Sequence, residues 1–143
     1  MAISQAVCNS FKSEILQGIH DLESGGDSFK LALYTAGATL TSSSTVYVTS
    51  GEVAASGQYS AGGGVLQSQQ VSLATGGVAI VDFADLSFTG VTLTARGALI
   101  YNATESNKAV AVLDFGSDKT ATSGTFTIQF PAFTSSAAIL RIA

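Results

Sequence analysis

The order of apolar and polar positions divides the chain into a short helical beginning and a long β-rich remainder. Near the N-terminus, apolar residues recur at spacings of three, four and seven, which is the period of one face of an α-helix. They are Val7, Phe11, Ile15, Leu16, Ile19 and Leu22. The run SGGD at 24–27 then supplies glycines that close helices and polar residues that favour turns. We therefore predict one α-helix that ends at this run.

From Phe29 onward, β-branched and aromatic residues form short runs separated by Gly, Ser, Thr and Asn, a pattern typical of all-β domains. We predict seven or eight strands, at residues 29–35, 45–50, 64–73, 77–83, 91–101, 108–115, 124–130 and 138–142. Their spacing indicates a sandwich or barrel. The expected fold class is therefore mainly β: an antiparallel β-sandwich or barrel-like domain over residues 28–143, preceded by a helical arm over residues 1–27.

The clearest strand pair is RGALIY at 96–101 and KAVAVLDF at 108–115, joined by the polar segment NATESN. Both runs are continuously apolar rather than alternating, which indicates strands covered on both faces. We expect this hairpin to be central to the sheet. The segment VSLATGG at 71–77 is interpreted as a strand that ends in a tight glycine turn.

The low fraction of charged residues distinguishes this chain from an ordinary soluble domain and indicates that it binds partners. Only 11% of the residues are charged, where a typical soluble domain carries about 25%. A folded monomer of this mass exposes roughly 6,900 Å², so the 16 charged side chains leave about one charge per 430 Å². Ordinary usage gives about one per 190 Å². With 46% hydrophobic residues, part of the surface is expected to be apolar and to bind other proteins.

Several function classes are not expected. The net charge of -4, with Lys and Arg scattered singly, argues against nucleic acid as a partner. The first residues do not have the pattern of a secretory signal, and no apolar run is long enough to span a membrane, so we predict a protein made in the cytoplasm without a membrane partner. The single Cys8 has no cysteine to pair with, and no zinc-ligand spacing occurs.

Catalytic chemistry finds little support in the sequence. The single histidine, His20, is assigned to the last turns of the predicted helix, where a surface or capping role is favoured. Cys8 is interpreted as a small buried thiol. The carboxylates are dispersed, and the close pair Asp82 and Asp85 is interpreted as strand-end and turn residues. No calcium-loop pattern is present. We predict no catalytic residue, no metal and no cofactor.

Arg96 interrupts a long apolar run, and a guanidinium in such a place needs a carboxylate or several carbonyl groups. The candidates for a structural ion pair with it are Asp82, Asp85 and Asp114. A pocket that gathers Arg96, Asp82 and Asp85 would instead favour an enzyme, which is kept as a minor alternative.

From Phe29 to the C-terminus, the chain resembles a family of small virion structural proteins encoded by tailed bacteriophages. The phrases that carry the resemblance are FKLALY at 29, GEV at 51, YSAGG at 59, VDFADLSF at 81, TARGALIYN at 94, NKAVAVLDFG at 107 and FTIQFP at 126. Where relatives have a Trp after the acidic pair, this chain has Phe88, which keeps an aromatic side chain for the core. The family has no catalytic motif to carry over.

The resemblance implies a capsid decoration or cement protein on the virion surface. The leading hypothesis is a non-enzymatic homo-oligomer, with a trimer favoured, that stabilises the head by binding the major capsid protein. Phe11, Ile15 and Ile19 are the candidate docking residues, since an apolar helix face can lie in a groove on a partner. Equally weighted is the alternative that the helix packs on its own domain.

Two further hypotheses concern other parts of the particle. The protein is alternatively a receptor- or glycan-binding module of a phage tail or head appendage, for which Tyr47, Tyr59 and Tyr101 would provide stacking surfaces. A head-tail (neck) component is the other structural alternative.

Overall fold

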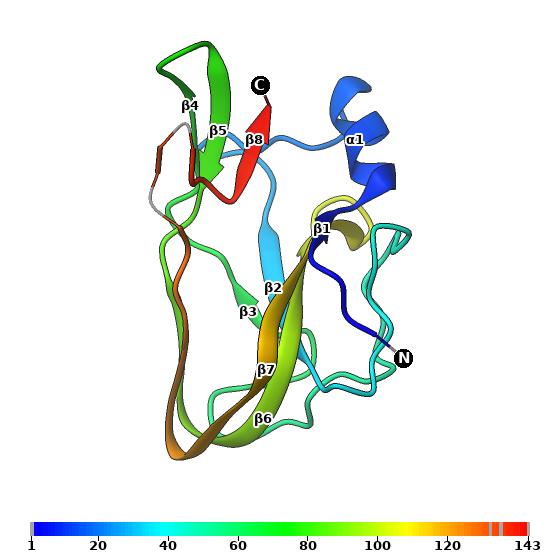
Figure 1. Ribbon diagram of the computed structural model, residues 1–143, viewed down its shortest axis with the longest axis vertical. Helices are drawn as coiled ribbons and strands as arrows, with labels where there is room; N and C mark the ends of the chain where they lie inside the picture. The colour runs from blue at the N-terminus through cyan, green and yellow to red at the C-terminus, as the bar shows by residue number, and fades with distance from the viewer. Residues whose placement is uncertain (1, 132, 135, 143) are drawn as a thin grey trace.

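The computed structural model describes residues 2–131, 133–134 and 136–142, and it shows a mainly β protein with one short N-terminal helix (Figure 1). Two antiparallel sheets, of five and three strands, make up the fold. The predicted fold class, an antiparallel β-sandwich-like domain with an N-terminal α-helix, is confirmed. The total accessible surface is 6867 Å², which agrees with the value expected for a compact monomer of this mass.

The larger sheet has the order β1-β7-β6-β2-β3. Its strands are β1 (Ala6–Val7), β7 (Lys108–Ile128), β6 (Leu86–Asn102), β2 (Phe29–Tyr34) and β3 (Gly64–Val65). The hairpin of β6 and β7 occupies its middle, as the continuous apolar runs predicted. The hairpin is covered on both faces where it crosses the sheet, and β2 beside it is almost entirely buried.

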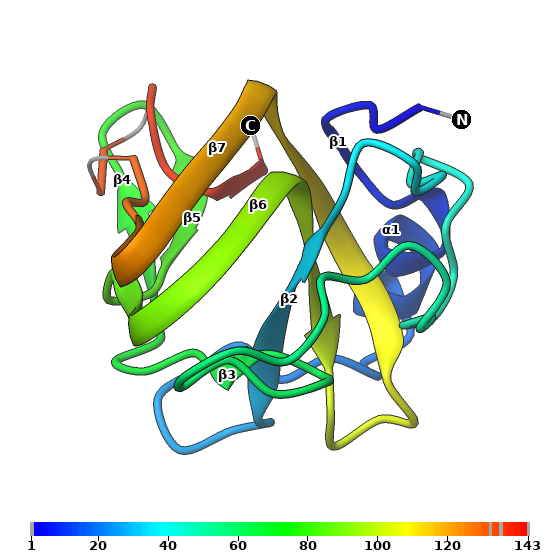
Figure 2. The same ribbon diagram turned by 90° about the horizontal axis from the view of Figure 1, so that it is seen from below.

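Strands β6 and β7 are much longer than the sheet that they cross. They bend together away from the other strands, and Figure 2 shows their far halves as a separate curved ribbon. The pairing register shifts at several points, including between Phe88 and Val91 and between Ala95 and Gly97. Such bulges increase twist and bend strands. Gly90, with φ 64°, lies at the first of these shifts, in a backbone conformation that glycine adopts without steric cost.

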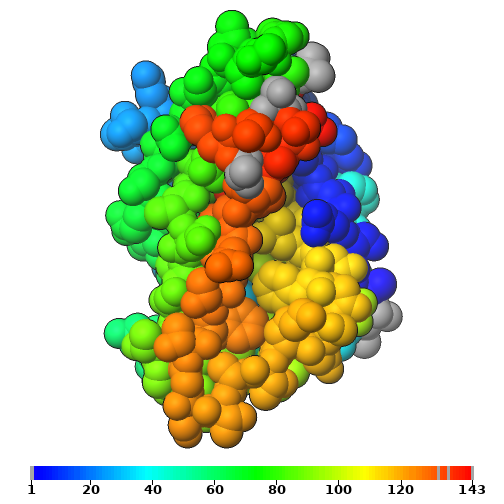
Figure 3. Space-filling view, turned by 60° about the vertical axis from the view of Figure 1, so that its left-hand side comes forward, coloured from blue at the N-terminus to red at the C-terminus, as the bar shows by residue number. Residues whose placement is uncertain are grey.

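The smaller sheet has the order β4-β5-β8. It consists of β4 (Gln70–Ala74), β5 (Val78–Asp82) and β8 (Leu140–Ile142). The turn between β4 and β5 contains Gly76 and Gly77, both with positive φ, so the glycine turn predicted after VSLA is present. In the space-filling view the hairpin of β4 and β5 lies at one end of the long axis of the molecule (Figure 3).

Several predicted strands differ from the observed ones. Residues 45–50 form no strand, only an isolated bridge from Val46 to Lys108, because this segment belongs to a long connection that covers the sheet. The predicted strand 64–73 is divided into β3 and β4. The two predicted strands at 108–115 and 124–130 are one continuous strand, since the polar residues between them stay paired with the far half of β6.

The helix α1 (Asn9–Leu16) ends much earlier than predicted. Gly18, with φ 75°, follows its last turn and takes the left-handed conformation that closes helices. Ile19 and Leu22 therefore lie beyond the helix, although they continue its apolar spacing. Residues from the segment 1–27, including Cys8, Phe11 and Leu22, join the same buried core as the strands of the larger sheet.

Candidate functional site

The surface that combines exposed apolar side chains with a concave shape lies between α1 and the smaller sheet. On α1, Phe11 is buried, Ile15 is half-buried against the core, and Leu16 is 88% exposed. The helix therefore uses one part of its apolar face for its own domain and leaves Leu16 in water. Because its own domain does not cover it, Leu16 is available for an intermolecular contact. Burying an aliphatic side chain of this kind is worth about 1.5–3 kcal/mol.

The smaller sheet presents an entirely apolar face to this region. Directly paired residues share a face in an antiparallel sheet, and so do residues two apart along a strand. The pairing therefore places two apolar rows on one face: Val71, Val81 and Leu140 in the first, and Leu73, Ala79 and Ile142 in the second. In the first row Val81 and Leu140 are buried, whereas in the second row Leu73 is 74% and Ile142 is 61% exposed.

Between α1 and this face lies a groove of about 770 Å³, which we call the α1–β8 groove. Its apolar wall and floor include Phe11, Ile15, Leu16, Val81, Leu140 and Ile142. Charged side chains line it as well, namely Lys12, Asp21, Glu23 and Arg141. An apolar concavity with a few charged residues is the form taken by surfaces that accept an apolar segment of another protein.

The three candidate docking residues, Phe11, Ile15 and Ile19, do not form one exposed helix face, as the apolar spacing had implied. Phe11 and Ile15 line the groove but contribute to the core from the same positions. Ile19 is half-buried beyond the end of the helix and is not among the lining residues. Leu16, which the sequence placed in the same stripe, is the helical residue that is free to contact a partner.

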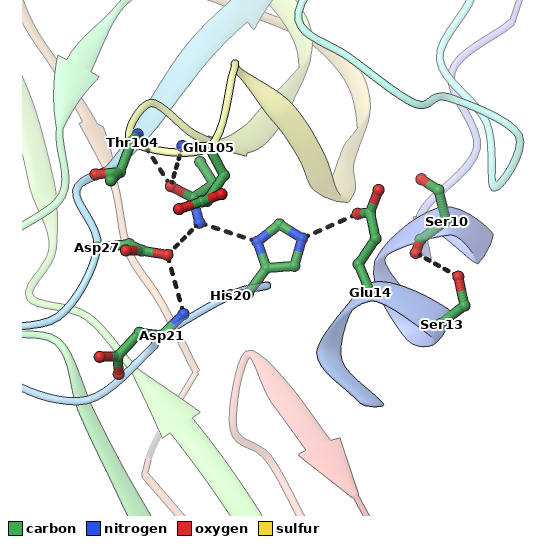
Figure 4. A network of polar contacts seen from close by, with 9 residues as sticks. Ser10, Ser13, Glu14, His20, Asp21, Asp27, Thr104 and Glu105 are labelled. Carbon is green, nitrogen blue, oxygen red and sulfur yellow. Dashed lines mark hydrogen bonds and ion pairs between the residues drawn. The ribbon is translucent and has the colours of Figure 1, made fainter. Parts of the chain in front are cut away.

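A buried polar network anchors the segment that follows α1, and Figure 4 shows His20 between Glu14 on the helix and Asp27 on the other side. The prediction of a surface or helix-capping histidine is wrong, because His20 is only 5% exposed and its ring packs 4.8 Å from that of Phe11. Its Nε2 lies 2.9 Å from Oε1 of Glu14, and its Nδ1 lies 3.0 Å from the amide nitrogen of Asn102.

The surroundings of Asn102 determine the tautomer of His20. The side-chain oxygen of Asn102 accepts hydrogen bonds from the backbone N–H groups of Thr104 and Glu105, so its amide nitrogen must point the other way. That nitrogen donates to Oδ2 of Asp27 at 2.8 Å and to Nδ1 of His20. Nδ1 is therefore an acceptor, and the proton resides on Nε2, which donates to Glu14. The two ring nitrogens thus hold the segment in two directions: Nε2 donates to Glu14 on α1, and Nδ1 accepts from Asn102 at the end of β6.

Arg96 contacts Asp114 among the three candidate carboxylates. Its Nε donates to Oδ1 of Asp114 at 3.2 Å, and both side chains are about one-third or less exposed. Asp82 and Asp85 have other surroundings. Asp85 accepts a hydrogen bond from the backbone N–H of Phe130, and burial, followed by the charge of Asp85, raises the pKa of Asp82. The structure thus does not bring Arg96, Asp82 and Asp85 together in one contact.

The tyrosines proposed for glycan stacking surround a carboxylate instead. Tyr59 and Tyr101 are buried, so they are not the exposed platforms that the glycan hypothesis requires. The hydroxyl groups of Tyr47 and Tyr59 both donate to Glu52, and the backbone N–H of Gly62 donates to the same carboxylate at 2.8 Å. Tyr47 stacks on Tyr101, and burial, aided by the charge of Glu52, raises the pKa of Tyr101 to about 12. These contacts attach the long connection after β2 to the sheet.

Within the part of the chain that the structure describes, no group of three or more His, Cys, Asp or Glu residues is placed to hold a metal ion. Among the same residues, no helix is both long and apolar enough for a membrane span. Comparisons of the chain with protein-family models, with curated proteins and with solved structures gave no match.

Proposed function

We propose that this chain is a non-enzymatic structural protein of a bacteriophage virion, a capsid decoration or cement protein that binds the major capsid protein through the α1–β8 groove. The observation that carries the proposal is the exposure of Leu16 on one side of the groove and of Leu73 and Ile142 near the other. The resemblance of the β-region to small phage virion proteins supports the choice of partner.

The lining of the groove is mainly aliphatic, with charged side chains at four of its fourteen positions. A contact that covers the groove therefore buries mainly aliphatic surface, and Lys12, Asp21, Glu23 and Arg141 favour binding only where they stay hydrated at the rim or meet an opposite charge on the partner. A standard interface takes about 800 Å² from each partner, which is a modest share of the 6867 Å² surface of this chain. Many copies on one shell would then stabilise it through repeated contacts.

The groove accommodates an apolar strand or an amphipathic helix of the capsid subunit. Leu16 and Ile142 would contact such a segment, while Lys12 and Asp21 at the groove offer charges of both signs to orient it. Hot-spot residues are typically few and central to an interface. We therefore expect binding to depend strongly on Leu16.

The test uses capsids of the encoding phage assembled without this protein. The purified chain should co-sediment with them, and Leu16→Asp should weaken binding at least ~10-fold, because it places a charge against an apolar segment. Val65→Asp is the matched control: Val65 is an exposed valine on β3, outside the groove lining and paired with Lys30. Failure of the unmodified chain to bind, or equal binding by Leu16→Asp, would contradict the proposal. Circular dichroism verifies that both variants are folded.

A further inference from the structure

The buried histidine lies between two partners that respond differently to its protonation. His20 is the single histidine of the chain, and its side chain is fully buried. Histidine is the residue whose charge ordinarily changes between pH 5 and 8. On one side, Nε2 of the ring contacts the carboxylate of Glu14 at 2.9 Å. On the other side, Nδ1 contacts the neutral amide of Asn102 at 3.0 Å. A carboxylate accepts from either form of the ring, whereas an amide nitrogen donates only to the neutral form.

A proton on Nδ1 is incompatible with the contact to Asn102. The amide nitrogen is a donor, and a protonated Nδ1 is a donor as well, so two N–H groups would face each other across 3.0 Å. Rotation of the amide does not remove the conflict, because its oxygen accepts from the backbone N–H groups of Thr104 and Glu105. A buried donor without an acceptor costs free energy. The charged ring is therefore expected to separate from Asn102.

The charged residues that the structure places around the ring are carboxylates. They are Glu14 on α1, Asp21 and Asp27 in the segment before β2, and Glu105 in the hairpin loop (Figure 4). The rings of Phe11 and Phe29 pack on the imidazole and do not titrate. Negative charge near a histidine favours its charged form. Glu14 can keep its contact with Nε2 in both charge states, so the contact with Asn102 is the one that distinguishes them.

We propose that protonation of His20 opens residues 19–22 away from the β6–β7 hairpin and thereby changes the lining of the α1–β8 groove. Both ends of this stretch have other attachments: Phe11 holds α1 in the core, and Gln69 donates to the backbone oxygens of Glu23 and Asp27. His20 holds the middle. The closed form binds the neutral ring, so it is favoured above the titration range of histidine and weakened below it.

The consequence concerns the groove, because the residues that follow the ring line it. Asp21, Leu22 and Glu23 are part of the groove lining, and Leu22 is only 7% exposed in the closed form. In the open form Leu22 leaves this place, so the groove has a different lining at pH 5 than at pH 7.5. The inference goes beyond capsid binding and applies to the isolated chain. Its test needs no capsid, and either hypothesis can fail without the other.

The experiment follows the ring and the segment by NMR over the same pH range. With one histidine in the chain, the ring nitrogen signals of ¹⁵N-labelled protein are unambiguous, and they should show the Nε2–H tautomer at pH 8 and the charged ring on acidification. As the ring titrates, the hydrogen-exchange protection factors of the Asp21 and Asp27 backbone amides, which are bonded within the segment, should fall at least ~10-fold. Those of β2 and β6, paired in the core, should not change.

Two outcomes would overturn the proposal. One is a charged ring with unchanged protection of Asp21 and Asp27. The other is a ring that stays neutral down to pH 5 in the folded chain. His20→Asn separates the histidine from other titrating groups, because its side-chain oxygen can accept from Asn102 and takes up no proton. This variant should keep its protection at pH 5, and a loss equal to that of the unmodified chain would show that the histidine is not the sensor.

Glu14→Gln supplies a second variant that keeps the ring and the shape of its neighbour. Loss of the negative charge beside Nε2 should move the ring titration to a pH about 1 unit lower, and the loss of protection should move with it. Asp118→Asn is the matched control, since it removes one negative charge at an exposed position of β7, ten residues along the strand from Lys108, the partner of Asn102. It should change neither. If the ring titration moves in Glu14→Gln while the loss of protection stays at its original pH, the proposal fails.

Discussion

His20 and Asn102 are 82 positions apart in the chain, and their side chains meet at 3.0 Å in the buried network that joins the N-terminal segment to the β6–β7 hairpin. Asn102 is fully buried, and it serves four partners: the side chains of Asp27 and His20 and two backbone N–H groups. A buried polar group that loses its hydrogen-bond partners lowers the stability of the folded state. Disruption of this network should therefore lower the free energy of unfolding.

Replacing Asn102 by Asp tests the hydrogen-bond assignment with almost no change in shape. The new carboxylate would face Oδ2 of Asp27, now 2.8 Å from the amide nitrogen, and like charges at that distance raise a carboxyl pKa strongly. We expect Asn102→Asp to lower the free energy of unfolding by about 3 kcal/mol at pH 7. Part of the loss should be recovered as the pH falls toward about 4, since the carboxyl then protonates. An unchanged urea midpoint at pH 7 would argue against the assignment.

The Arg96–Asp114 pair predicts a pH-dependent contribution to stability. The backbone N–H of Gly116, and then Arg96, hold the pKa of Asp114 below its usual value. A depressed pKa in the folded state means that the stabilisation is present above the unfolded pKa, near 3.9, and is lost as the pH falls through the folded value. Asp114→Asn should therefore be less stable than the unmodified chain at pH 7, and the difference should shrink at pH 2–3. Urea titrations at both pH values measure it; a difference independent of pH would contradict the assignment.

Cys8 should be almost unreactive in the folded protein. Its side chain is fully buried, and burial, followed by the charge of Glu14, raises the pKa of its thiol to about 11. Because the thiolate is the reactive form, we expect reaction with an aromatic disulfide reagent at pH 8 to be at least ~100-fold slower than in the urea-unfolded chain. Equal rates in the two states would show that the N-terminal segment is undocked in solution.

Truncation of two residues of α1 should have very different effects on the free energy of unfolding. Phe11 is buried against the core, so Phe11→Ala should cost about 3–5 kcal/mol of unfolding free energy. Leu16 is 88% exposed, so Leu16→Ala should change stability by less than about 0.5 kcal/mol. Thermal and urea unfolding measure both. A large loss of stability in Leu16→Ala would mean that the residue is covered within the isolated chain.

Local pattern was enough to predict the centre of the fold. The apolar runs at Phe29–Tyr34 and 97–101 are buried on both faces, and uninterrupted apolar runs bounded by turn residues are typical of strands that are covered in this way. The helix end was missed because Gly18 and Gly25 give the same closing signal, and both take positive φ. Only the packing of the following segment decides between them.

The candidate site was predictable only in part, because it depends on contacts between distant segments. Leu16 belongs to the predicted stripe, but its exposure follows from the position of α1 over the core. The apolar face that lies across the groove combines Val71, Val81 and Leu140, and no spacing within one segment indicates that these meet. The same holds for His20, which contacts Phe11 on α1 and Asn102 at the end of β6.

The place of β1 in the sheet has a consequence for synthesis in the cell. Its partners are Ala111 and Val112 on β7, and the backbone of Cys8 is bonded to Val110. Ribosomes add about 5–20 residues per second, so Ala6 and Val7 wait about 5–20 s for the strand that receives them. During that interval Phe11 and its apolar neighbours are without their native cover. Ala6, Val7 and Cys8 therefore cannot reach their final positions until β7 has been synthesised.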